Sequence, residues 1–108
     1  MMKLYLDTSN NQKTVVGIDG KRKIYRYESA REQNVLAAIS ETFKKQKITI
    51  ADITSVEVVT GPGSFTGLRV GVSIVNALSY ALKVSVNGRP AGSLIMPTYG
   101  KKPNIQSR

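Results

Sequence analysis

Cysteine and histidine are both missing from this chain of 108 residues. Without cysteine, the chain can form neither a disulfide nor a thiolate metal site. Without histidine, it cannot build a Ser-His-Asp triad, an H-E-x-x-H zinc site or the general base that is most common near neutral pH. Carboxylate-bound Mg²⁺ remains compatible with the composition, because Mg²⁺ prefers oxygen ligands. We expect no cofactor, while carboxylate-based Mg²⁺ chemistry stays open.

Long apolar runs are also missing, since none approaches the ~20 residues that a membrane helix needs. The segment Met1–Asp7 meets a charge too early for a secretion signal. These two absences predict a cytoplasmic protein with no membrane partner. The hydrophobic content of 41% is typical of a globular chain, and the length suits one domain with a real core.

Acidic residues are missing from the second half of the chain, because none follows Glu57. The formal net charge is +9, and basic residues also cluster at Lys21–Lys23 with Arg26 and at Lys44–Lys47. Such a surface attracts nucleic acid by neutralising phosphates, but it also fits a solvated surface that aids solubility. Aromatic residues make up 6% of the chain, which is few for a platform that stacks bases. A tRNA contact through the basic surface therefore stays open.

A glycine-rich segment lies between the apolar run at 56–59 and a predicted helix at 72–82. Its residues are Gly61, Pro62, Gly63, Ser64, Phe65, Thr66, Gly67, Leu68, Arg69, Val70 and Gly71. Their spacing fits neither G-x-G-x-x-G nor the Walker loop, and Pro62 breaks the nucleophile-elbow pattern. Ser64 or Thr66 can cap the helix, and the turn can either hold an anion or pack the helix tightly on a sheet.

The order of predicted elements is β-β-β-α-β-α-β. Alternation and turn signals predict strands at 3–7, 14–19 and 22–28, with a hairpin at Asp19-Gly20. A capping box at Ser29 and Glu32 predicts a helix that ends near 45–47 and places Val35, Leu36, Ile39 and Phe43 on one face. A strand at 56–60, the second helix and a strand at 83–86 follow.

Right-handed crossovers make the first, fourth and fifth strands parallel, with the second and third as an antiparallel extension. This is an α/β fold with a mixed five-stranded sheet and two main helices, the ribonuclease-H-like core of the actin and sugar-kinase superfamily. We assign residues 1–88 to this domain. Residues 89–108 carry three prolines and no helical period, which predicts an extended or partly disordered basic tail.

The second helix is apolar around most of its circumference, apart from a narrow polar stripe that begins at Arg69. A helix of this kind is covered on more than one side, either by the first helix or by a partner chain. Gly67 and Gly71 would leave a groove that another helix could approach closely. Arg69 fits either a contact with a partner carboxylate or tRNA phosphate, or a solvated position, and Phe65 is expected to anchor the turn in the core.

The segment 6–9 (Leu-Asp-Thr-Ser) together with residues 61–71 resembles the TsaB (YeaZ) family. The agreement in element order extends over residues 1–88. The family carries a second actin-like domain after the fifth strand, so this chain resembles its N-terminal half. The family was once labelled glycoprotease, and the absence of histidine and cysteine argues separately against a metalloprotease.

The resemblance implies a non-catalytic subunit that pairs with TsaD, the threonylcarbamoyltransferase acting on a tRNA adenosine next to the anticodon. TsaE is a third, ATPase subunit. Pairing in the family uses the two N-terminal helices, which implies a partner surface made of Val35, Leu36, Ile39, Gly67, Val70, Gly71, Ile74 and Leu78. Alone, the chain is expected to form a homodimer through the same surface.

Two other functions remain open. One is a basic RNA-binding module, and the other is a small Mg²⁺-dependent nuclease of the ribonuclease-H type that uses Asp7. A nuclease would need partner carboxylates, and Glu28, Asp52 and Glu57 have no convincing position at a strand end. Asp7 is therefore interpreted as structural, its carboxylate accepting hydrogen bonds from nearby backbone groups.

Overall fold

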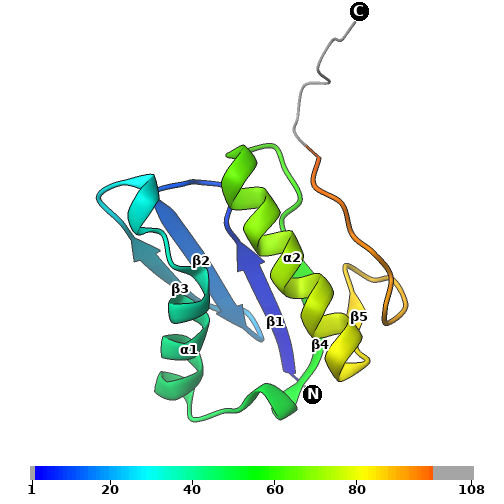
Figure 1. Ribbon diagram of the computed structural model, residues 1–108. Coiled ribbons are helices and arrows are strands. Elements are labelled where there is room, and N and C mark those ends of the chain that lie inside the picture. The colour runs from blue at the N-terminus through cyan, green and yellow to red at the C-terminus, as the bar shows by residue number, and fades with distance from the viewer. Residues whose placement is uncertain (1, 99–108) are drawn as a thin grey trace, which may run out of the picture.

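The computed structural model describes residues 2–98 as a mixed five-stranded sheet with two helices (Figure 1). The strands are β1 (Met2–Asp7), β2 (Lys13–Ile18), β3 (Lys21–Arg26), β4 (Ile53–Val58) and β5 (Ser85–Val86). The helices are α1 (Val35–Gln46) and α2 (Phe65–Leu82), and two short 3₁₀ turns, η1 (Ala30–Glu32) and η2 (Ile50–Asp52), precede α1 and β4. The predicted element order and fold class are confirmed.

The sheet has the strand order β3-β2-β1-β4-β5. β1 pairs in parallel with β4, and β4 in parallel with β5, as the right-handed crossovers predict. β2 pairs antiparallel with both β1 and β3. Asp19 and Gly20 join β2 to β3 with φ of 49° and 89°, the left-handed geometry that suits a tight hairpin.

Both helices cover the same face of the sheet, so the core lies in one layer between them and the strands (Figure 1). Alternate strand residues point into this layer, because successive side chains of a strand face opposite ways. The fully buried members of the core include Leu4, Leu6, Val16, Val56 and Val75. The opposite face of the sheet carries the intervening residues, among them Lys3, Tyr5 and Arg22.

The first helix starts later than the capping box predicts. Ser29 precedes only the 3₁₀ turn η1, and its side chain makes no capping hydrogen bond. α1 is capped instead by Asn34, whose Oδ1 accepts from the backbone N–H of Ala37 at 3.0 Å. The predicted end is confirmed, since Lys47 is in the left-handed conformation that terminates α1.

The second helix starts at Phe65, directly after Ser64, one of the two predicted caps, and so includes most of the glycine-rich segment. It is long and apolar enough, by length and composition alone, to pass for a membrane span. Its buried residues (Leu68, Val72 and Val75 among them) pack on the sheet. The core helix of a two-layer fold meets the same criteria of length and composition for this reason.

The chain after β5 runs back along α2 (Figure 1). Ile95 is 5% exposed and belongs to the core cluster. The Asn76 side chain holds it at both backbone groups, with Nδ2 donating to the Ile95 carbonyl at 2.9 Å and Oδ1 accepting from its N–H at 3.0 Å. The predicted tail is thus extended and packed as far as residue 98, while its remainder lies outside the described residues. The domain boundary at residue 88 stays a prediction.

Asn87 closes the sheet where β5 ends. Its Oδ1 accepts from the Val58 N–H at 2.8 Å and its Nδ2 donates to the Val58 carbonyl at 3.1 Å, so the side chain acts as one more residue of strand.

Because Val58 is buried, we expect Asn87→Ala to destabilise the chain by about 2–3 kcal/mol, through unpaired backbone groups and a left-handed φ of 48°. Urea unfolding measures the loss. Asn87→Gly removes the same two hydrogen bonds without the left-handed strain that alanine would suffer, so it should cost less than Asn87→Ala. Stability equal to that of the parent chain would show that the two hydrogen bonds contribute nothing.

Candidate protein-interaction site

Hydrogen bonds within the chain fix the glycine-rich turn at the start of α2. Ser64 caps α2, because its Oγ accepts from the N–H of Gly67 at 3.2 Å, and Thr66 is not the cap. The Ser64 N–H donates to the Ser9 carbonyl at 2.7 Å, and the Leu68 N–H donates to the Ser64 carbonyl at 2.9 Å. Of the two interpretations of this turn, these bonds favour tight packing, since they hold Ser64 and the first turn of α2 against the end of β1 and against each other.

Three glycines of the motif lie against the end of β1. A Cβ at Gly63 would meet the carbonyl oxygen of Ser9, and one at Gly67 would meet the carbonyl oxygen of Thr8. A Cβ at Gly71 would meet the Thr8 Oγ1, which itself donates to the Gly67 carbonyl at 2.5 Å. Gly67 and Gly71 are buried within the domain, so here the structure differs from the expectation that they leave room for another helix. The close approach they permit is to β1.

Thr8 is the residue of this contact that the sequence pattern did not single out. It lies within the segment 6–9 and is fully buried. Two glycines four residues apart on one helix face are a signal that something approaches closely. A small polar residue directly after a buried strand is a natural candidate for the group that approaches the two glycines. Asn76 likewise has no signal in the sequence for its role, because its partner Ile95 is distant in sequence and follows no periodic pattern.

Phe65 is not a core anchor, because its side chain is 56% exposed. The Arg69 guanidinium lies over its ring, 5.3 Å from the centroid. A cation–π contact on an exposed helix turn contributes about 0.5–1 kcal/mol. Arg69 is therefore tied to Phe65, one turn earlier in α2, a partner that neither of the expected interpretations included.

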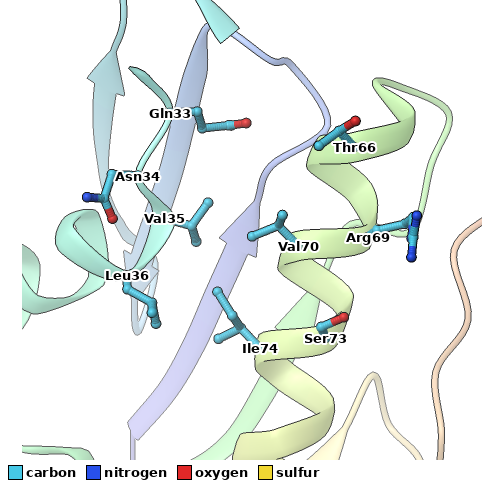
Figure 2. Close-up of a pocket in the computed structure, with 9 residues that line it drawn as sticks. All are labelled: Gln33, Asn34, Val35, Leu36, Thr66, Arg69, Val70, Ser73 and Ile74. Atoms are coloured by element: carbon cyan, nitrogen blue, oxygen red, sulfur yellow. The ribbon is translucent and has the colours of Figure 1, made fainter. Parts of the chain in front are cut away.

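An apolar groove of about 510 Å³ separates the N-terminal halves of α1 and α2. Val35 and Leu36 from α1 face Val70 and Ile74 from α2 across it (Figure 2). Arg69 and Ser73, farther round α2, also line the groove and add polar groups to its rim. Leu36 is 65% exposed and Val70 is 39% exposed. The first helix therefore does not fill the space beside α2, and four apolar side chains line an open surface.

The predicted partner surface is thus divided between groove and core. Val35, Leu36, Val70 and Ile74 line the groove. Ile39 is buried in the core, and Leu78 is partly buried and packs against it. Val35 lines the groove but is itself buried in the core, at 4% exposed. Leu36, Val70 and Ile74 are therefore the residues that can touch another chain without rearrangement, and the candidate site is narrower than the predicted set.

Asp7 makes local hydrogen bonds at the end of β1. Its Oδ1 accepts from the Ser9 N–H at 2.9 Å and from the Ser9 Oγ at 2.6 Å. Within residues 2–98, no three side chains of Asp, Glu, His or Cys come together as a group that could hold a metal ion. The contacts of Asp7 fit the structural interpretation of this residue.

Comparisons with known proteins point to one family. A family model described as TsaD, tRNA N6-adenosine threonylcarbamoyltransferase, matches residues 27–88, which is more than half of the chain. The tRNA threonylcarbamoyladenosine biosynthesis protein TsaB of Buchnera aphidicola is 33% identical over 89 residues, covering 79% of this chain and 42% of that protein. TsaB of Bacillus subtilis is 25% identical over 111 residues, covering 89% of this chain and 48% of that protein.

The solved structure of YeaZ from Pseudomonas aeruginosa has the same fold, with a TM-score of 0.68 and 24% identity. The alignment covers 80% of this chain and 43% of that one. The chain therefore spans less than half the length of the relatives that it matches. Sequence and fold together show that the chain belongs to the TsaB (YeaZ) family, within the wider family of the threonylcarbamoyltransferase model.

Proposed function

We propose that this chain is a non-catalytic subunit in the biosynthesis of threonylcarbamoyladenosine in tRNA, and that it pairs with a TsaD-type catalytic subunit. The proposal is supported by the relatives named for this pathway. The observation that carries it is the open groove between α1 and α2, whose exposed Leu36 and Val70 offer an apolar seat for helices of another chain.

The composition supports a scaffolding role over a catalytic one. Neither histidine nor cysteine is present, and the carboxylate of Asp7 is engaged by Ser9. A scaffold of this kind stabilises the active conformation of its partner by binding it, which requires complementary surface and no reacting group. A cytoplasmic location for the protein, where tRNA is modified, fits this role. A TsaE-type ATPase is a second candidate partner in the same complex.

Light scattering on a sizing column tests the pairing, with the chain alone and then mixed with the TsaD-type subunit of the same organism. We expect a homodimer alone, because the same apolar groove can pair with itself about a two-fold axis, and a heterodimer in the mixture. A chain that stays monomeric and ignores the TsaD-type subunit would contradict the proposal.

The nuclease alternative has a direct test. If Asp7 held a catalytic Mg²⁺, Asp7→Asn should abolish cleavage of an RNA by the purified chain while leaving its fold intact. We expect no cleavage by either form, because among the described residues no second and third carboxylate join Asp7. Metal-dependent cleavage that disappears in Asp7→Asn would favour the nuclease over the scaffold.

A further inference from the structure

Strand β3 forms one edge of the sheet and is unusually basic. Its sequence is Lys-Arg-Lys-Ile-Tyr-Arg, and all four of its cationic residues are exposed. We call this set the basic edge: Lys21, Arg22, Lys23 and Arg26. It lies at the opposite end of the strand order from β5, and none of its residues lines the groove between α1 and α2.

The basic edge presents charge to both sides of the sheet. Lys21 and Lys23 pair with Ile18 and Val16, two residues buried beneath the helices, so these lysines lie on the helix side. Arg22 pairs with Gly17 on the opposite face. Because side chains alternate along a strand, a ligand lying along this edge meets cations from above and below.

The charge on this edge is not neutralised within the described part of the chain. The ion pairs found between residues 2 and 98 are Lys3 with Glu57 and Lys45 with Glu41, and neither involves the basic edge. Asp19 and Glu28 flank the strand, but an oxygen of Asp19 accepts from the Lys3 backbone N–H at 2.8 Å. Four exposed cations on six residues therefore leave a concentrated positive patch.

Nearby aromatic side chains are already engaged, which bears on what the patch can bind. Arg22 covers the Tyr5 ring at 4.1 Å from its centroid. The Tyr25 hydroxyl bonds to the Thr42 Oγ1 at 2.8 Å, and the Tyr27 hydroxyl to the Thr14 Oγ1 at 3.2 Å. Arg22 occupies one face of the Tyr5 ring, and the Tyr25 and Tyr27 rings are half-buried, so the patch fits a partner recognised mainly by charge.

We propose that the basic edge binds the phosphate backbone of RNA, without reading its sequence. Regularly spaced phosphates are the ligand that complements a linear array of exposed cations, and their neutralisation releases counterions. The proposal rests on the proposed function only in taking tRNA as the RNA. The competing explanation is protection of an edge strand against aggregation, for which lysine on the edge is a common device.

Anisotropy of a labelled, unmodified tRNA transcript tests this, titrated with the full chain between 50 and 200 mM KCl. One variant replaces Lys21, Arg22, Lys23 and Arg26 by glutamine. The matched control replaces four exposed cations elsewhere by glutamine, namely Arg31, Lys44, Lys45 and Arg89. Each set of four removes four charges, so the formal net charge falls from +9 to +5 in both variants.

We expect the basic-edge variant to bind at least about tenfold more weakly at 50 mM salt, and the slope of log affinity against log salt to shrink by about 3. The control should stay within about twofold of the parent chain. Equal losses in both variants would overturn the proposal, since net charge alone would then explain binding. Unchanged binding in the basic-edge variant would also overturn it, leaving edge protection as the explanation.

Three further measurements keep the result specific. The double variant Lys21→Gln with Lys23→Gln, which makes a smaller change to the edge, should shrink the slope by about half as much. RNA would be overturned as the partner if a labelled polyglutamate bound as tightly as tRNA and if the same variants lost that binding. Pairing with the TsaD-type subunit should survive in the basic-edge variant, so a failure of RNA binding and a failure of pairing are read separately.

Discussion

Replacing Gly71 by alanine should destabilise this chain by about 2–3 kcal/mol, the cost of forcing an atom into a closed contact. Alanine is intrinsically the better helix former by about 1 kcal/mol, so the expected sign opposes helix propensity. The reason is that the new Cβ would meet the Thr8 Oγ1 at the end of β1. Gly67→Ala should cost at least as much, because its Cβ would meet the Thr8 carbonyl oxygen, which cannot rotate away. Urea unfolding followed by circular dichroism measures both losses.

Thr8→Ala distinguishes the contact at Gly71 from the contact at Gly67. It removes the Oγ1 and Cγ2 atoms that oppose a side chain at Gly71, but it leaves the carbonyl that opposes one at Gly67. In the Thr8→Ala background, Gly71→Ala should therefore cost at least about 1 kcal/mol less than in the parent chain, whereas the cost of Gly67→Ala should not change. The matched control is Gly17→Ala, where the nearest atom is the Cγ of the flexible Arg22 side chain. A stabilising Gly71→Ala would show that the contact with Thr8 is not what requires glycine there.

The glycine motif illustrates how far local sequence determines this fold. Alternating strands, the Asp19-Gly20 hairpin and the crossover rule were sufficient to predict the three parallel strands and the antiparallel extension, because each depends on periodicity or on a few adjacent residues. The motif also marked the turn into α2. Its contact with Thr8 joins residues far apart in the chain, and no local pattern indicates which strand end a helix will meet.

Helix starts and exposed aromatic residues show where local sequence is not sufficient to predict the structure. Ser29 and Glu32 have the spacing of a capping box, yet they precede only a 3₁₀ turn, and Asn34 caps α1 instead. Phe65 is apolar but exposed, since the turn that precedes it directs its ring outward toward Arg69. In both cases several local solutions are close in energy, and tertiary packing selects among them.

The candidate site was predicted more broadly than the structure places it. Periodicity assigns Val35, Leu36 and Ile39 to one helix face, but it cannot say where the sheet ends and open surface begins. In the structure Ile39 lies in the core and Leu36 lies at the groove, although the two are less than one turn apart. The distinction matters for experiment, because a change at Ile39 tests folding, whereas a change at Leu36 tests binding.

Leu36→Glu and Val70→Glu should each weaken pairing with the TsaD-type subunit by about 100-fold or more, if the groove is the docking surface. Each change deletes an apolar contact and places a charge where an interface would exclude water, and the sum exceeds about 3 kcal/mol. Both side chains are exposed in the chain alone, at 65% and 39%, so the free energy of unfolding should change by less than about 1 kcal/mol. Isothermal titration calorimetry of each variant against the TsaD-type subunit measures the affinity.

Tyr80→Glu is the matched control, because Tyr80 also lies on α2, is 78% exposed and is outside the groove. It should pair as the parent chain does. Self-association should follow the same order, since an isologous homodimer would bury the groove of each copy. If Tyr80→Glu weakened pairing as much as the groove variants do, the docking surface would have to lie on another part of α2. If all three variants paired normally, helix docking through this face would be excluded, and pairing would have to use another surface of the chain.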